Sequence, residues 1–162
     1  MNKILLSACL LGDPVRYDGQ SKTQRNAALD KLLSQHRVIS FCPEVAGGLP
    51  VPRAAAEIHA GDGAAVLAKL ASVKTKDGTD VSEFFLSGAR QALALCREHD
   101  IRVAVLTESS PSCGSSQIYD GSFTRSTIPG SGVTAALLAQ NGIKVFNQHQ
   151  LKEALIHLEA DL

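Results

Sequence analysis

In Lys3-Ile4-Leu5-Leu6-Ser7-Ala8-Cys9, a short apolar run typical of a β-strand is followed closely by a cysteine. The same pattern occurs twice more: Val38-Ile39-Ser40-Phe41 leads directly into Cys42, and Val103-Ala104-Val105-Leu106 is followed, after a short loop, by Cys113. Parallel strands place their carboxyl ends at one edge of a sheet, where open α/β folds carry their active sites. We therefore expect the three thiols to gather at one sheet edge.

The rest of the chain alternates between strand and helix signals. Strands are predicted at 3–8, 38–41, 102–106 and 143–147, and helices at 23–36, at 81–99, after 130–132 and at the carboxyl end. Asp80, with Glu83 three residues later, is the expected N-cap of helix 81–99. A Gly- and Pro-rich loop spans 42–53, and 61–79 is ambiguous, with short strands favoured. This order predicts an α/β fold: a single domain, 1–162, built as a Rossmann-like three-layer sandwich with a mostly parallel sheet.

The composition limits the possible partners. The formal net charge is zero and the charges are mixed along the sequence, so no basic stripe predicts binding to a nucleic acid helix. No stretch approaches the roughly 20 apolar residues of a membrane span. Four cysteines among 162 residues are too few for a disulfide-stapled secreted domain. We expect a cytoplasmic protein with reduced thiols and a small or weakly charged substrate.

The cysteines themselves suggest a metal site. Cys96 lies on the apolar stripe of helix 81–99 and is expected to be a buried core residue. The other three share the strand-to-loop context, and thiolates select zinc, Cu(I) or iron–sulfur clusters. A structural zinc would need a fourth ligand. A cluster with three cysteine ligands and one open iron, acting as a Lewis acid, fits best. The histidines are not expected to be ligands. His59 is predicted in a loop and could reach the site, but we do not expect it to bind the metal. Three others lie near helix ends, where we expect partial exposure: His36, His99 and His149.

Polar residues near the cysteines are candidates for catalysis. Glu44 is either a plain loop carboxylate or a general base beside the cluster. Ser110 and Ser112 either shape the turn before Cys113 or hydrogen-bond to the cluster or a substrate. Four further polar residues are predicted on the same sheet edge, each of which alone could be a surface residue: Arg16, Tyr17, Asp18 and Arg53.

Taken in order, these motifs strongly resemble the formerly uncharacterised family that contains thiouracil desulfidase. The resemblance runs through nearly the whole chain, in the segments 7–12 (SACLLG), 16–19 (RYDG), 42–45 (CPEV), 47–50 (GGLP), 52–53 (PR), 110–114 (SPSCG), 119–123 (YDGSF) and 130–134 (GSGVT).

The resemblance implies a [4Fe-4S] cluster held by Cys9, Cys42 and Cys113, with the fourth iron free. It also implies a non-redox removal of sulfur from a small thiolated compound such as 2-thiouracil, giving uracil and hydrogen sulfide. Glu44 matches the family's catalytic carboxylate, which would activate water. Ser110 matches its catalytic serine, which would position the substrate or move a proton. Tyr17, Arg53 and Ser112 are then expected to bind the substrate.

Two other functions are compatible with the same residues. Cys113 could be the nucleophile of a thiol hydrolase or transferase, although no histidine is well placed as its base. Alternatively, the protein could be a binding module that carries sulfide on the cluster without catalysing a reaction. Turnover of a thiocarbonyl and the presence of iron distinguish these possibilities.

Overall fold

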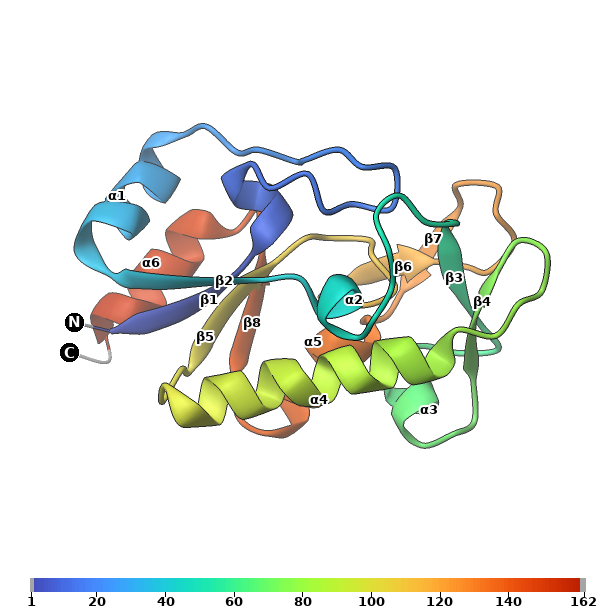
Figure 1. Ribbon diagram of the computed structural model, residues 1–162. Coiled ribbons are helices and arrows are strands. Elements are labelled where there is room, and N and C mark those ends of the chain that lie inside the picture. Colours follow the sequence, from blue (N-terminus) through green and yellow to red (C-terminus); the bar gives the residue numbers. More distant parts are fainter. Residues whose placement is uncertain (1, 161–162) are drawn as a thin grey trace.

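The computed structural model, which describes residues 2–160, contains a four-stranded parallel sheet between two layers of helices (Figure 1). The strands are β1 (Lys3–Ser7), β2 (Arg37–Phe41), β5 (Val103–Leu106) and β8 (Lys144–Asn147), in the order β2-β1-β5-β8. Helices α1 (Ala27–Gln35) and α6 (Leu151–Ala160) cover one face, and α4 (Ser82–Glu98) and α5 (Val133–Gln140) cover the other. The predicted α/β sandwich is confirmed.

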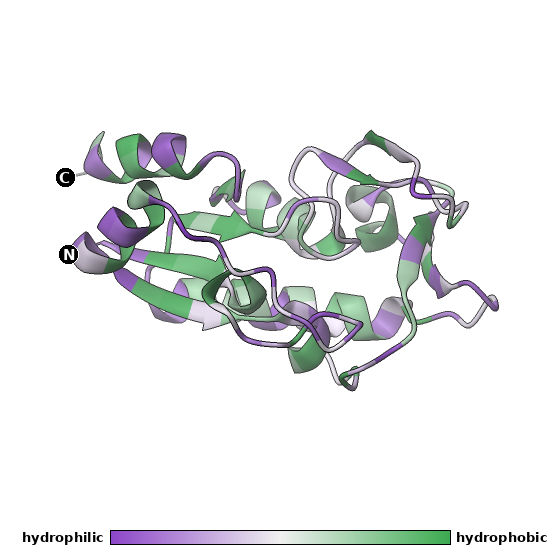
Figure 2. Cartoon of the chain, turned by 90° about the horizontal axis from the view of Figure 1, so that it is seen from above, coloured by the Kyte–Doolittle hydropathy of each residue, from purple (hydrophilic) through white to green (hydrophobic). Residues whose placement is uncertain are grey.

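The central strands are buried on both faces, as a parallel sheet requires. Ile4 and Leu6 point toward α1 and α6, whereas Leu5, between them, points toward α4 and α5. All three side chains are at most 1% exposed. Figure 2 shows the strands as a hydrophobic layer between helices that carry hydrophilic residues. This burial explains why the sequence shows continuous apolar runs at β1 and β5.

Two helices begin later than the sequence predicted. Helix α1 begins at Ala27, where the Asn26 side chain accepts a hydrogen bond from the Leu29 amide at 2.9 Å. It does not begin at 23 because the Lys22 and Gln24 amides bond instead to the carbonyls of a 3₁₀ turn, η1 (Ala8–Leu11). Helix α4 begins at Ser82 with Val81 at the N-cap, so Asp80 is not the N-cap. Asp80 lies one residue before the N-cap, and its carboxylate accepts a hydrogen bond from the amide of Ser82, the first residue of the helix.

The segment after β2 contains elements that the sequence did not reveal. Helix α2 (Pro43–Ala46) lies within the predicted loop 42–53. Of the ambiguous segment 61–79, only β4 (Ser72–Thr75) is the strand that was favoured. Its first part is helix α3 (Gly63–Leu67), because Asp62 accepts a hydrogen bond from the Ala65 amide at 3.0 Å and caps it.

Three unpredicted strands complete the structure at one end of the sheet. Strand β3 (Ala56–His59) pairs antiparallel with β4, and β6 (Gln117–Tyr119) pairs antiparallel with β7 (Thr127–Pro129). Ile58 of β3 and Ile118 of β6 are buried in a third apolar cluster with residues of α3, α4 and α5. The two antiparallel strand pairs are therefore packed against the sandwich.

The exposure of the histidines near helix ends was predicted correctly for two of three. His36, expected to be partly exposed, is only 6% exposed. The prediction fails because α1 passes directly into β2 and leaves no loop for this residue. His99 is half-buried and His149 is exposed, as expected.

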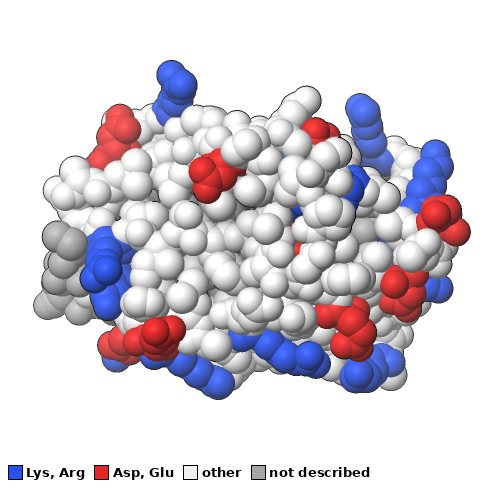
Figure 3. Space-filling model, in the orientation of Figure 1, with Lys and Arg blue, Asp and Glu red and all other residues white. Residues whose placement is uncertain are grey.

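On the face shown in Figure 3, basic and acidic side chains are interspersed. None of the helices within residues 2–160 combines the length and the apolar character needed to cross a membrane.

Candidate active site

A cavity of about 280 Å³ opens at the carboxyl ends of β1, β2 and β5. Its position matches the switch point of the sheet, because the chain leaves β1 toward β2 on one side and leaves β5 toward β8 on the other. Cys9, Cys42 and Cys113 all line the cavity, as the sequence predicted, together with Glu44 and Ser110. Three segments far apart in the chain thus form one site.

The three thiols are free and mostly buried. The Cys9 sulfur lies 3.0 Å from the Thr107 hydroxyl oxygen, and the Cys42 sulfur lies 4.0 Å from the Val15 carbonyl oxygen. Burial raises the pKa of each thiol. The pKa of Cys113 is raised further by the charges of Cys42, Glu44 and Cys9. A cationic group bound at the three thiols would offset these effects and favour the thiolate forms.

This donor set fits an iron–sulfur cluster, since three soft thiolates beside a cavity are what such a cofactor requires. Among residues 2–160, no three or more His, Cys, Asp or Glu side chains are grouped so as to hold a single metal ion. In a cluster each cysteine binds a different iron, so three thiols around one cavity need not meet at one ion. His59 does not line the cavity; its ring packs against Phe123, with centroids 6.0 Å apart. Cys96, as expected, lies in the core against α5 and the sheet, where burial raises its pKa to about 11.

Helix α2 holds Cys42 and Glu44 through close contact with α4. An added Cβ at Gly47 would lie 2.0 Å from the Phe84 carbonyl oxygen, and one at Gly88 would lie 2.0 Å from the Pro43 carbonyl oxygen. Both contacts are possible only for glycine. The single turn of α2 therefore rests directly on the backbone of α4 and fixes the direction in which Glu44 points.

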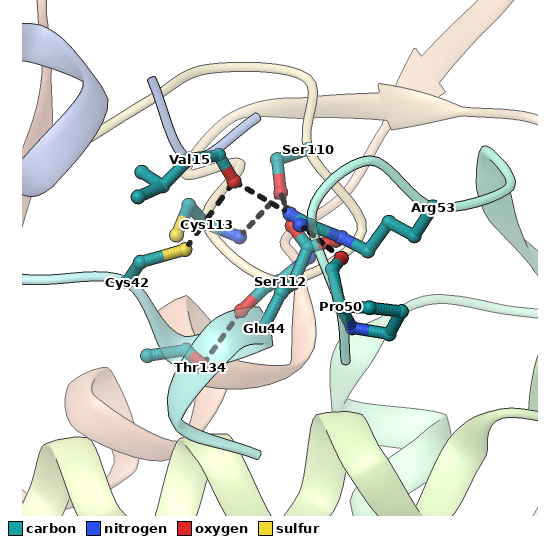
Figure 4. Close-up of polar contacts among 9 residues, drawn as sticks. All are labelled: Val15, Cys42, Glu44, Pro50, Arg53, Ser110, Ser112, Cys113 and Thr134. Carbon is teal, nitrogen blue, oxygen red and sulfur yellow. Dashed lines mark hydrogen bonds and ion pairs between the residues drawn. The ribbon is translucent and has the colours of Figure 1, made fainter. Parts of the chain in front are cut away.

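The Glu44 carboxylate is held by two partners (Figure 4). Its Oε1 accepts from Arg53 Nε at 3.3 Å, and its Oε2 accepts from the Ser110 hydroxyl at 3.3 Å. Burial raises the pKa of Glu44, and the Arg53 charge and the hydrogen bonds of Arg53 and Ser110 oppose this effect. The two predicted catalytic residues are thus in direct contact.

The Ser110 hydroxyl has a defined orientation. Its oxygen accepts hydrogen bonds from the amides of Ser112 and Cys113, at 3.1 and 3.2 Å. Since both amides donate, the hydroxyl hydrogen is left for Glu44. Ser110 therefore connects the carboxylate to the backbone of the third cysteine.

Helix α5 fixes the loop that carries Cys113. The amides of Val133 and Thr134 donate to the carbonyls of Pro111 and Ser112, each at 2.8 Å. Ser112 itself is fully buried and its hydroxyl lies 2.9 Å from that of Thr134, so it does not line the cavity (Figure 4). Of the expected substrate-binding residues, Ser112 alone is outside the cavity.

Arg53 and Tyr17 both line the cavity, but Arg53 is buried and hydrogen-bonded within the protein, whereas Tyr17 is partly exposed to solvent. The Arg53 side chain is 5% exposed, and besides Glu44 it donates to the carbonyls of Pro50 at 3.1 Å and Val15 at 3.0 Å. Tyr17 is 43% exposed. Arg53 is therefore committed to holding the site together, whereas the Tyr17 ring stands at its mouth.

Sequence reasoning missed several residues that line the cavity. Glu57 belongs to the unpredicted strand β3 and carries no pattern that would mark it. Segment 119–123 was recognised only as a motif and a turn. The missed residues are Lys22, Glu57, Glu108, Tyr119, Phe123 and Arg125.

The chain resembles known proteins over nearly its whole length. A curated relative, the uncharacterized protein YbbK of Bacillus subtilis (strain 168), is 41% identical over 152 residues, which cover 94% of this chain and 99% of YbbK. The solved structure of a [4Fe-4S]-dependent thiouracil desulfidase, TudS, superimposes with a TM-score of 0.89 at 48% sequence identity, and the match covers 99% of each chain. The profile of the 2-thiouracil desulfurase family matches residues 4–150. The chain therefore belongs to the 2-thiouracil desulfurase family.

Proposed function

We propose that this protein is a desulfidase that replaces the sulfur of a thiocarbonyl, such as that of 2-thiouracil, with oxygen from water. The products are the carbonyl compound and hydrogen sulfide, so no electrons are transferred. The observation that carries the proposal is the contact between Glu44 and Ser110 in a cavity lined by three free thiols. Membership of the 2-thiouracil desulfurase family supports it.

Cys9, Cys42 and Cys113 would hold a [4Fe-4S] cluster through three of its irons. TudS, a relative of known structure, is a [4Fe-4S]-dependent thiouracil desulfidase. When bound, the cluster would supply a Lewis acid at its fourth iron that polarises the thiocarbonyl. Because the chemistry needs reduced thiols, we place the enzyme in the cytoplasm.

Glu44 would take the proton from the attacking water. Arg53 and Ser110 each occupy one of its oxygens, so the carboxylate is held in a single position. Backbone amides occupy the Ser110 oxygen, and its hydroxyl hydrogen points to Glu44 before the reaction. Once Glu44 has taken a proton from water, this hydroxyl would be free to turn toward the departing sulfur. Ser110 is thus suited to deliver a proton to the departing sulfur and to regain one from Glu44.

The remaining predicted residues take different roles. Tyr17, at the mouth, would contact the substrate. Arg53 positions Glu44, because each of its three donor groups is engaged within the protein. Ser112 supports the turn before Cys113 through Thr134.

The test is sulfide release from 2-thiouracil by protein purified without oxygen, with iron content and the absorption spectrum measured on the same sample. Glu44→Gln should retain the cluster and lose sulfide release, because it keeps the shape of the side chain and removes its basicity. Glu83→Gln, at an exposed carboxylate of α4, is the matched control. Full activity in Glu44→Gln would contradict the role of Glu44, and iron-free protein with full activity would contradict the cluster.

The alternative of a nucleophilic Cys113 is less well supported. Attack requires the thiolate, and burial raises the pKa of this thiol strongly. No histidine is found among the described residues that line the cavity. A sulfide carrier would hold the cluster without repeated turnover of a thiocarbonyl, so repeated turnover distinguishes an enzyme from it.

A further inference from the structure

Glu57 is a buried carboxylate on the wall of the cavity that has no part in the proposed chemistry. It is 8% exposed and belongs to β3 rather than to the loops that carry the cysteines. A buried carboxylate normally has its oxygens satisfied by hydrogen bonds. The two oxygens of Glu57 differ in this respect.

One oxygen of Glu57 holds the neighbouring loop. Oε1 accepts from the amides of Gly121 and Phe123, at 2.9 and 3.2 Å. Gly121 approaches β3 so closely that an added Cβ would lie 2.9 Å from the Ile58 carbonyl oxygen. The loop is thereby pinned along β3.

The other oxygen, Oε2, accepts no hydrogen bond from any residue between 2 and 160. Because Glu57 lines the cavity, this oxygen is an acceptor available to a bound molecule. A carboxylate accepts hydrogen bonds and donates none, so it selects a donor such as a ring N–H.

The same loop carries two strained residues on the cavity wall. Phe123 and Arg125 have φ angles of +58° and +64°, in the left-handed region that bulky residues avoid. Such strain persists where surrounding contacts enforce it, and it is concentrated at functional sites. At Phe123, the hydrogen bond from its amide to Glu57 and the packing of its ring against His59 support this conformation.

We propose that Glu57 is a substrate-recognition residue whose Oε2 accepts a hydrogen bond from a ring N–H of a cyclic thioamide or thiourea, with the Phe123 ring forming part of the adjoining wall. This inference rests on the proposed function, since it names the part of the substrate that the desulfidase site would read. In this proposal, residues on β3 and on the loop after β6 recognise the substrate ring, whereas residues at the ends of the parallel strands carry out the chemistry.

Glu57→Gln provides a selective test. Its amide oxygen can still accept from Gly121 and Phe123, which turns the NH₂ group toward the cavity and replaces an acceptor with a donor. Sulfide release is measured with 2-thiouracil, 1-methyl-2-thiouracil and 3-methyl-2-thiouracil. In the wild type, methylation of the recognised nitrogen should lower kcat/KM by about 10–100-fold, the cost of losing a hydrogen bond to a charged group.

Glu57→Gln should lower kcat/KM for 2-thiouracil by a similar factor, mainly by raising KM. With the methylated compound that the wild type already uses poorly, the substitution should cause no further loss of kcat/KM. Iron content should be unchanged, and Glu83→Gln serves as the control. Equal losses for all three compounds, or unchanged kcat/KM for 2-thiouracil, would overturn the proposal.

A binding measurement makes the test independent of turnover. Uracil carries the same ring N–H groups, so calorimetric titration of uracil into the cluster-loaded wild type and Glu57→Gln should show about 10–100-fold weaker binding to the variant. If the wild type released no sulfide but still bound uracil more tightly than Glu57→Gln does, the desulfidase function would be refuted and the role of Glu57 in recognising the ring would stand. Active wild-type protein with no difference would refute only the role of Glu57.

Discussion

Gly88 on α4 lies against Pro43 on α2 so closely that a Cβ at Gly88 would be 2.0 Å from the Pro43 carbonyl oxygen. Pro43 stands between Cys42 and Glu44, so this contact links the packing of the long helix to the position of both site residues. The spacing of the two helices is therefore part of the active-site geometry.

Gly88→Ala should destabilise the protein, although alanine ordinarily favours a helix. The added methyl group must push α2 away, and overpacking of this kind costs about 1–3 kcal/mol. We expect a lower Tm together with reduced iron content. Arg90→Ala, at an exposed position of α4, is the control that should change neither. Unchanged iron content in a destabilised Gly88→Ala would show that α2 can move without disturbing the ligand.

The cysteines should separate into two classes. Alanine at Cys9, Cys42 or Cys113 should greatly reduce iron content after anaerobic reconstitution, because each removes one of three ligands. Cys96→Ala should retain iron, since Cys96 lies in the core, outside the cavity. Iron loss in Cys96→Ala comparable to that of the other variants would contradict the assignment.

Ser110 and Ser112 should differ in the kind of defect they cause. Ser110→Ala should keep the cluster spectrum and lower turnover by about 10²–10⁴-fold, the usual contribution of proton transfer by a positioned group. Ser112→Ala should lower turnover less and reduce cluster stability, because it leaves the buried Thr134 hydroxyl without its partner. The two serines would be reversed if Ser112→Ala were the inactive, cluster-loaded protein.

Arg53→Lys should retain the positive charge beside Glu44 but lose the fork that also engages the carbonyls of Pro50 and Val15. We expect iron content close to wild type and kcat reduced by up to about 10²-fold, the effect of misplacing a catalytic group by about 1 Å. A rise in KM with unchanged kcat would instead assign Arg53 to substrate binding, as the sequence suggested.

Glu108 should make stability depend on acid pH. Burial raises its pKa, but hydrogen bonds from Ser116 and from the amides of Gln117, Ser116 and Ser109 outweigh this and lower the pKa below 4.5. A depressed pKa contributes stability above the unfolded-state value, and this is lost as the pH falls through the folded-state value. The stability difference between wild type and Glu108→Gln, measured by urea unfolding, should therefore shrink below about pH 4.5. A constant difference would contradict this linkage.

The sequence predicted the chemistry-bearing half of the site because that half depends on buried parallel strands. Strands β1 and β5 are covered on both faces, so they appear as continuous apolar runs, and each is followed within a short segment by a site cysteine, Cys9 after β1 and Cys113 after β5. The pairing of Leu5 with Ile39 and Ala104 then aligns the strand ends. The gathering of the thiols thus follows from local patterns, whereas the order of the strands was learned from the structure.

The other half had no such pattern. Strands β3, β6 and β7 have three or four residues each, too few to show a period. Helix α2 was hidden because glycine and proline usually indicate a loop, whereas here Pro43 opens the helix and Gly47 allows contact with α4. Glu57 is one carboxylate among many until the fold places it on the cavity wall.

The arrangement of the thiols has a consequence for how the enzyme is made. Cys9, Cys42 and Cys113 become neighbours only when β1, β2 and β5 lie side by side, with α5 bonded to the last loop. A nascent chain that ends before Cys113 cannot offer a complete site. A group bound by all three thiols can therefore take its final place only after Cys113 has been synthesised and β1, β2 and β5 have paired.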